Sequence, residues 1–299
     1  MKTLKRILAA TTLLVTLGFA SEANAQVPLE NFFKNPEKAG YQISPDGKYF
    51  SYMAPYENRL NLFVQEVGSD KATRITSETV RDLAGSMWAN GHRILYIKDT
   101  AGDENFQLYG VNVDGTDSKA YTAFPKVRTT IIDPLENIDS LVIIGLNKRN
   151  PQVFDPYRLN LNNGELTQLA ENPGNIQGWM TDHNGKLRVA LAIVDGVNTQ
   201  ILYRETEEQP FRPVLTTNFR ETVSFATFTP DNKMVYALTN IGRDKTALVL
   251  MDPATCEEKE VLYTNDKYDI SGLGYSELEK EINLCILYRT QRYYPSLLR

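Results

Sequence analysis

The sequence has few of the residues on which metal, redox and acid–base chemistry depend, since its 299 residues include two cysteines, two histidines and two tryptophans. Two cysteines permit at most one disulfide bond. Cys256 follows a turn and Cys285 lies within an expected strand, so we interpret both as small buried apolar residues; a disulfide between them is the alternative. His92 and His183 each fall in an expected turn, which argues against either as a catalytic base.

Positive charge and long apolar runs are also scarce. The chain has 32 lysines and arginines against 37 aspartates and glutamates, and its formal net charge is −5. A mildly acidic chain without a basic block argues against nucleic acid as a partner. Beyond the first 25 residues no apolar stretch is long enough to span a membrane. No cluster of side chains has the spacing of a metal or cofactor site, so we expect neither.

The first 25 residues have the pattern of a secretory signal peptide. A basic start is followed by the apolar run 7–19 and by Ala23-Asn24-Ala25, a small-x-small cleavage site. A buried N-terminal helix is the alternative. We expect cleavage near Ala25, a mature chain that begins near Gln26, and export to a periplasmic or extracellular space. Removal of three basic residues and one acidic residue moves the formal net charge from −5 to −7.

What the chain does have is a pattern that returns about every 46 residues. Each copy is a polar turn followed by an apolar strand. The turns are Ser44-Pro45-Asp46-Gly47, Ala89-Asn90-Gly91-His92, Ile132-Asp133-Pro134, Thr181-Asp182-His183-Asn184-Gly185 and Thr229-Pro230-Asp231-Asn232. The strands begin near Tyr49, Ile94, Leu141, Leu187, Met234 and Ile282, in steps of 45, 47, 46, 47 and 48 residues. Short strands between such turns indicate small antiparallel sheets.

A second strand recurs in phase with this first strand. Its copies lie at 61–64, 107–111, 156–159, 200–203 and 247–250, and a short third strand follows at 73–76, 165–169 and 260–263. One small sheet cannot bury both faces, whereas sheets stacked around an axis can. We therefore predict an all-β fold, a β-propeller of four-stranded blades over residues 26–299. Six copies of the first strand and five of the second predict five complete blades and an incomplete sixth, as in a fragment or a prematurely terminated chain.

Several segments resemble a known family. They are 28–36 with 41–48 (PLENFFKNP and YQISPDGK), 99–109 and 269–273. These segments are similar to the N-terminal propeller of prolyl oligopeptidase-family serine peptidases, in the dipeptidyl- and acylaminoacyl-peptidase-like branch of exported bacterial enzymes. The resemblance covers nearly all of residues 28–292. It implies an α/β-hydrolase domain after the propeller, with a serine in a Gly-x-Ser-x-Gly elbow, then an aspartate and a histidine.

That catalytic half is missing from the sequence. No Gly-x-Ser-x-Gly occurs, and Gly274-Tyr275-Ser276-Glu277-Leu278 lacks the second glycine and lies in a β-repeat rather than a strand-to-helix turn. We therefore predict no catalytic residue in this chain and no activity of the chain alone. The last residues, 293–299, depart from the expected strand and loop, as an early stop or a frameshift would produce.

An acidic cluster beside Gly102 is the candidate binding group. It consists of Asp99, Asp103 and Glu104. In some relatives propeller carboxylates hold the free amino group of a substrate, so the resemblance implies that Asp103 and Glu104 contact such a group. The alternative, which we prefer, is a turn whose Asp and Asn side chains bond their own backbone. The stretch 182–185 is likewise interpreted as a hairpin turn rather than a metal site.

Two hypotheses for the function remain. In the first, the chain is the substrate-gating propeller of an exported serine peptidase that acts on short peptides, with a hydrolase domain as its partner. In the second, it is a stand-alone exported propeller that binds a protein or a carbohydrate. The incomplete sixth repeat argues for the first hypothesis, because a functional ring is expected to finish its blades. A propeller enzyme with its site in the central channel is disfavoured by the scarcity of histidine. The oligomeric state is not predicted.

Overall fold

The computed structural model describes residues 27–288. The expected signal peptide, its cleavage site near Ala25 and the C-terminal residues 289–299 lie outside these described residues. The described chain divides into two units, residues 27–37 and residues 38–288. In the first unit, helix α2 (Glu30–Phe33) makes a single turn, which begins as the N–H of Asn31 donates to the carbonyl of Pro28 at 3.0 Å. Nowhere in residues 27–288 is there a helix long and apolar enough to cross a membrane.

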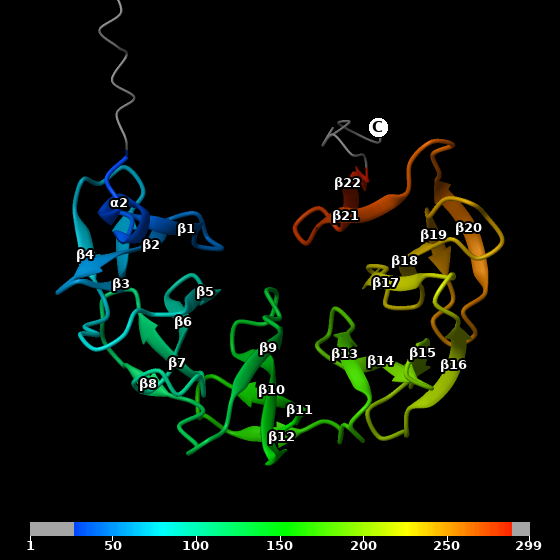
Figure 1. Cartoon of the computed structure of the whole chain (residues 1–299), viewed down its shortest axis with the longest axis horizontal. Coiled ribbons are helices and arrows are strands. Elements are labelled where there is room, and N and C mark those ends of the chain that lie inside the picture. Colours follow the sequence, from blue (N-terminus) through cyan, green and yellow to red (C-terminus); the bar gives the residue numbers. More distant parts are fainter. Residues whose placement is uncertain (1–26, 289–299) are drawn as a thin grey trace, which may run out of the picture. The chain divides into compact units, whose positions relative to one another are not determined.

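The second unit is built from antiparallel sheets that follow one another along the chain, named sheets 1 to 6 in that order (Figure 1). Sheet 1 contains β1 (Ala39–Ile43), β2 (Tyr49–Tyr56), β3 (Arg59–Glu66) and β4 (Ala72–Arg74). Sheet 2 contains β5 (Gly85–Asn90), β6 (Arg93–Lys98), β7 (Gln107–Asn112) and β8 (Lys119–Ala120). Sheet 3 contains β9 (Thr129–Asp133), β10 (Leu141–Asn150), β11 (Val153–Asn160) and β12 (Leu166–Gln168).

The remaining sheets repeat this arrangement. Sheet 4 contains β13 (Ile176–Thr181), β14 (Leu187–Val194), β15 (Asn198–Tyr203) and β16 (Arg212–Thr217). Sheet 5 contains β17 (Val223–Phe228), β18 (Val235–Thr239), β19 (Ala247–Met251) and β20 (Glu258–Tyr263). Sheet 6 has two strands within the described residues, β21 (Ile270–Ser276) and β22 (Glu281–Leu287). The predicted all-β class is confirmed, and consecutive four-stranded antiparallel sheets are typical of a β-propeller-like fold.

The six strands predicted to open each repeat exist, but they are the second strand of their sheets. The strand expected near Leu187, for example, is β14, and β13 precedes it and pairs with it. The preceding strands contain Gly, Ser, Thr and Gln, as in the sequence IQGWMT of β13, so no apolar run marks them. Three predicted turns lie partly in such strands, since residues 89–90 belong to β5, residues 132–133 belong to β9 and residue 181 belongs to β13.

The repeated turns have a local physical cause. In the first turn the Ser44 hydroxyl donates to the Asp46 carboxylate at 2.7 Å, and the same carboxylate accepts the N–H of Lys48. These bonds favour the ionised form and lower the pKa of Asp46 to about 2. Thr229 and Asp231 repeat the arrangement in sheet 5, with a hydroxyl–carboxylate distance of 2.6 Å. The turn chemistry therefore places each second strand against its neighbour.

Strand alternation directs apolar side chains into the spaces between sheets. Buried clusters join sheets 1 and 2, sheets 2 and 3, sheets 4 and 5, and sheets 5 and 6. Typical members are Leu62 with Ile94, Leu108 with Val142, Val189 with Val235, and Leu248 with Ile270. Each fully buried aliphatic side chain stabilises the fold by about 1.5–3 kcal/mol. Among the described residues no such cluster joins sheets 3 and 4, although β9 contacts β13 there.

The connections between strands alternate between the two ends of each sheet, because neighbouring strands are antiparallel and follow chain order. Links between the first and second strands, and between the third and fourth, lie at one end, which we call the turn end. Links between the second and third strands, and from one sheet to the next, lie at the opposite end, which we call the loop end. This topology decides which residues distant in sequence can share a site.

Candidate functional site

The predicted acidic cluster lies in the link between β6 and β7, at the loop end of sheet 2. The structure brings all three carboxylates into one loop. Asp99 is 8% exposed; its carboxylate accepts the N–H of Glu104 at 3.2 Å and lies 3.6 Å from Nε of Arg81. Asp103 accepts backbone N–H groups of Thr100 at 3.2 Å and Asn105 at 3.1 Å. The buried Asp99 thus holds the loop in place, while Asp103 and Glu104 are exposed.

The two exposed carboxylates differ in what they are bonded to. The side chain and backbone N–H of Asn105 donate to Asp103 and lower its pKa. These are the bonds of the turn interpretation, in which Asp and Asn side chains bond their own backbone. Within the described residues the carboxylate of Glu104 has no hydrogen bond or ion pair. Glu104 therefore has the freer carboxylate, and contact of either residue with a substrate amine stays a prediction.

Both histidines lie in turns at the turn end, as predicted. His183 is held between sheets, since its Nε2 lies 2.9 Å from the carbonyl oxygen of Phe228. Its ring stacks on Tyr275 with a centroid distance of 5.5 Å, and its Nδ1 lies 3.5 Å from the carboxylate of Glu277. In the part of the chain that the structure describes, neither histidine is hydrogen-bonded to a serine side chain, so neither has the geometry of an acyl-transfer base.

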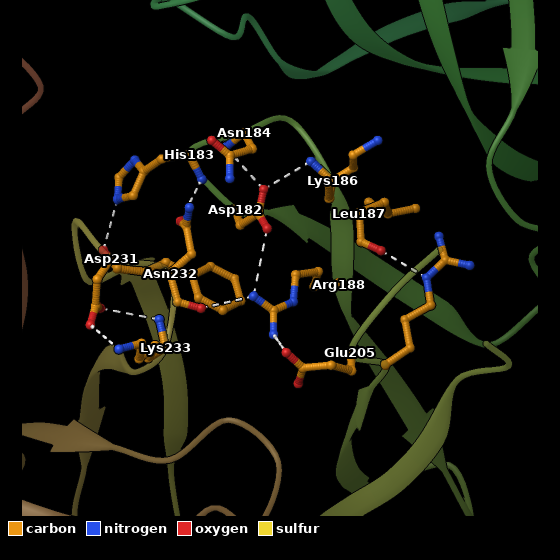
Figure 2. Close-up of polar contacts among 12 residues, drawn as sticks. Asp182, His183, Asn184, Lys186, Leu187, Arg188, Glu205, Asp231, Asn232 and Lys233 are labelled. Atoms are coloured by element: carbon orange, nitrogen blue, oxygen red, sulfur yellow. Dashed lines mark hydrogen bonds and ion pairs between the residues drawn. The ribbon is translucent and has the colours of Figure 1, made fainter. Parts of the chain in front are cut away.

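The stretch 182–185 is the predicted hairpin turn, and Figure 2 shows its bonds. The Asp182 carboxylate accepts the N–H groups of Asn184 and Lys186, each at 3.0 Å. Arg188 follows on β14; its guanidinium lies 3.5 Å from Asp182 and donates to the Asn232 carbonyl at 2.8 Å. The Asn232 side chain in turn accepts the N–H of His183 at 2.9 Å. These bonds lock the turn of sheet 4 to the turn of sheet 5, which is a structural role.

A cavity of about 320 Å³ at the turn end has an acidic lining. The carboxylates of Asp133, Glu136, Asp182 and Glu277 line it, together with His183 and Tyr275. Most of these carboxylates are already bonded within the protein. Asp133 accepts the Thr181 hydroxyl, and Glu277 accepts the side-chain N–H of Asn137 at 2.9 Å. Across residues 27–288 no group of three or more His, Cys, Asp or Glu side chains is arranged to hold a metal ion.

Two further predictions concern sheet 6 and the cysteines. Ser276 ends β21 and the chain turns directly into β22, so the segment 274–278 is a hairpin and not a nucleophile elbow. Cys256 and Cys285 are both free thiols, and both are half-buried rather than fully buried as the sequence interpretation expected. Burial raises the pKa of Cys256 to about 11 and also raises that of Cys285.

Comparison with known proteins identifies relatives along most of the chain. No family model matches. "Dipeptidyl aminopeptidase BIII" of Pseudoxanthomonas mexicana is 30% identical over 249 residues, which cover 80% of this chain and 35% of that protein. The chain is a homologue of dipeptidyl peptidases. "Dipeptidyl peptidase family member 6" of Caenorhabditis elegans, another such relative, is 26% identical over 290 residues, which cover 90% of this chain and 39% of that protein.

These dipeptidyl peptidase relatives confirm the family resemblance seen in the sequence. The chain spans little more than a third of their length. A prolyl endopeptidase structure matches 85% of this chain and 40% of its own chain, with a TM-score of 0.59 and 12% identity. An oligogalacturonate lyase from Vibrio parahaemolyticus matches 85% of this chain and 72% of its own, with a TM-score of 0.54 and 12% identity. At this identity the structures show a shared fold, which serves more than one chemistry.

The contacts that organise the turn end were not singled out from the sequence. Asn137 and Glu277 are 140 positions apart, and His183 and Tyr275 belong to different repeats. A period of about 46 residues places such residues in equivalent sheets but does not say which of them touch. The repeat of polar turns was the available signal, because each of these contacts lies in or beside a turn.

Proposed function

We propose that this chain is the substrate-gating propeller domain of an exported serine peptidase that acts on short peptides. The observation that carries the proposal is its 30% identity with a dipeptidyl aminopeptidase over 249 residues that form 35% of that protein. An enzyme of this class needs a nucleophile, a base and an orienting acid. We place these groups on an α/β-hydrolase domain that partners the propeller, so the chain alone is inactive toward peptides.

In this proposal the sheets are successive blades. Sheets 1 to 5 are complete blades of about 46 residues, and the two described strands of sheet 6 belong to a sixth. A propeller seated over an active site admits peptides only through narrow openings, which limits substrates to short or unstructured chains. The segment 1–25 directs export, and cleavage near Ala25 releases the mature chain in a periplasmic or extracellular space.

The predicted amine contact belongs to the same proposal. A dipeptidyl peptidase must cleave its substrate two residues from the free N-terminus. A carboxylate that binds the N-terminal ammonium group by a charge-assisted hydrogen bond fixes that position. Glu104, with its unengaged carboxylate, is the group we assign to this contact. Asp103 supports it by keeping the loop in its turn.

The deciding experiment extends the gene beyond codon 299 and translates all three forward frames. We expect one frame to continue the sixth blade and to reach a Gly-x-Ser-x-Gly segment, then an aspartate and a histidine. The extended protein should react with a serine-directed phosphonate and hydrolyse dipeptide arylamides, whereas residues 26–299 alone should do neither. The extended protein should also fail to degrade a folded protein that begins with the same dipeptide as the arylamide.

Two outcomes would contradict the proposal. If no frame encodes the triad, the proposal is wrong and the second hypothesis, a stand-alone binding module, takes its place. If the extended enzyme degrades the folded protein as fast as the arylamide, the gating role is wrong even though the peptidase assignment stands.

A further inference from the structure

The interface between sheets 3 and 4, which we call the 3–4 seam, encloses a crevice of about 460 Å³. Its lining residues belong to β9, to the beginning of β11, to the link before β13 and to β13 itself. None of the side chains that line it is Asp, Glu, Lys, Arg or His. Gly174 and Gly178 leave parts of the wall without side chains. An uncharged crevice of this size suits a ligand that carries no charge, because a buried charge without a partner is costly.

The crevice lies between two strands that each have one free edge. β9 is the last strand in the order of sheet 3, and β13 is the first in the order of sheet 4. Such edges present backbone N–H and C=O groups that no neighbouring strand satisfies. A ligand with its own alternating N–H and C=O groups, that is, a peptide main chain, is complementary to them.

One amide group already occupies the edge of β13. The side chain of Asn172, 5% exposed, accepts the N–H of Ile176 at 3.1 Å and donates to the carbonyl of Ile176 at 2.9 Å. This two-way pairing is the one that a peptide unit of an added strand would make. From Gly178 to Met180, β13 pairs regularly with β14 on one side, and its other edge has no strand partner in sheet 4. The Asn172 amide therefore shows how a main-chain amide of a bound peptide would pair with this edge of β13.

Aromatic and amide side chains complete the crevice. Trp179 and Phe154 supply aromatic walls, and Gln152 and Gln177 are exposed at its border. Trp179 also lines two adjoining cavities of about 380 and 140 Å³, and its ring lies 5.6 Å from that of Phe211. A half-buried tryptophan beside open space offers apolar area together with an N–H donor.

We infer that the crevice of the 3–4 seam binds a neutral, extended peptide segment. The main chain of that segment lies along the edge of β13, and one apolar side chain packs against Trp179 and Phe154. The inference rests on the proposed function in that it takes the ligand to be a peptide. It adds a contact for residues of the substrate that are remote from the bond being cleaved, and this contact belongs entirely to the present chain.

The test measures binding by tryptophan fluorescence. The Trp88→Phe variant leaves Trp179 as the single tryptophan, because the chain has two. The probe is the blocked peptide acetyl-Ala-Leu-Phe-Ala-amide, for which we expect a saturable change in Trp179 emission. A copy N-methylated at Phe cannot donate that N–H and should bind about fivefold more weakly. A copy with Lys in place of Phe should bind more weakly still, since the crevice offers no acid to pair with it.

Side-chain variants assign the site. Gln152→Ala and Gln177→Ala should each weaken binding of the blocked peptide by up to about fivefold, the effect of one hydrogen bond. Gln168→Ala is the matched control, an exposed glutamine on β12 outside the crevice, and should leave binding unchanged. Because these glutamines are exposed, their replacement should not unfold the protein.

Three results would overturn the inference: no saturable change with the blocked peptide, equal binding of the N-methylated copy, or equal binding of the uncharged sugar maltotriose. The outcome is separable from that of the proposed function. Binding to this chain is measured without hydrolysis, so a gene that encodes no triad leaves the fluorescence result intact. Likewise, an inert crevice leaves the search for the triad unaffected.

Discussion

The guanidinium of Arg158 lies 2.7 Å from the carboxylate of Glu207, and this ion pair joins sheet 3 to sheet 4. Both side chains are largely buried, at 19% and 15% exposure. Arg158 also donates to the carbonyl of Gly185 at 2.8 Å. No buried apolar cluster of the described residues spans the 3–4 seam, and these polar bonds cross it. Because the Arg158–Glu207 pair is charged, its contribution to stability depends on pH.

The first prediction concerns this seam. Burial alone would raise the pKa of Glu207, but hydrogen bonds from the N–H of Leu187 and from Arg158 outweigh it and lower the pKa. Because the folded pKa is the lower one, the stabilisation is fully present above the unfolded glutamate pKa of about 4.3. It is lost as the pH falls through the folded value. Glu207→Gln should therefore cost about 1–3 kcal/mol at pH 7 and progressively less below pH about 4.

Thermal unfolding between pH 7 and pH 3 measures this difference. Glu66→Gln is the control, because Glu66 is exposed at the end of β3 and has no ion pair among the described residues. Its replacement should change stability by less than about 0.5 kcal/mol at any pH. A Glu207→Gln penalty that does not diminish in acid would show that the charge of Glu207 does not hold the seam.

The second prediction isolates a contact between turns. Gly185 has φ +71°, and a Cβ there would lie 3.0 Å from Cδ1 of Leu135 in sheet 3. Gly196 has φ +74°, but a Cβ there would meet nothing within 4 Å. Gly196→Ala should cost about 1 kcal/mol through backbone strain alone, and Gly185→Ala should cost at least about 1 kcal/mol more through overpacking. Chemical denaturation measures both; equal losses would mean that the Leu135 side chain moves aside freely.

The third prediction separates the two exposed carboxylates of the β6–β7 link in an enzyme extended by the hydrolase domain. Glu104→Gln should raise KM about tenfold for dipeptide arylamides with a free N-terminus, because a charge-assisted hydrogen bond is lost. Asp103→Asn should lower the melting temperature through the weakened turn. Kinetics with Glu66→Gln as the control check the first claim. Unchanged KM for Glu104→Gln would assign the amine contact elsewhere.

The fourth prediction concerns the cysteines. With its pKa raised to about 11, Cys256 has roughly a hundredfold less thiolate near neutral pH than an unperturbed thiol. Both thiols should react slowly with a disulfide reagent such as dithionitrobenzoate in the folded chain and rapidly after unfolding in guanidinium. An intact mass that corresponds to a disulfide, or thiols that appear only after reduction, would contradict the two free cysteines of the structure.

The parts of the fold that were predictable are those with local causes. The Ser44–Asp46 and Thr229–Asp231 turns form from neighbouring residues, and the strands after them are apolar because both faces are covered. The first strand of each sheet escaped prediction because its residues are mixed in polarity. In β13, for example, pairing with Leu191 of β14 keeps Gly178 in the strand, although glycine has a low strand propensity.

The candidate site was predictable only within one loop. Asp99, Asp103 and Glu104 are close in sequence, so their grouping was visible, but the bonds that occupy Asp103 and leave Glu104 free were not. The 3–4 seam had no signal at all. Its crevice exists because apolar packing is missing between two sheets, and a missing contact between distant residues leaves no local pattern.

By itself the sequence determined the all-β class, the period of about 46 residues, the approximate positions of the turns and the kinship with dipeptidyl peptidases. All of these depend on residues that are near one another or on a repeated spacing, and both are written directly along the chain. Tertiary structure alone decided which sheets share an apolar core, that Arg158 meets Glu207, and that Trp179 borders an uncharged crevice. Those features arise when the faces of separate sheets pack together. They therefore depend on the combined shapes of side chains from different repeats.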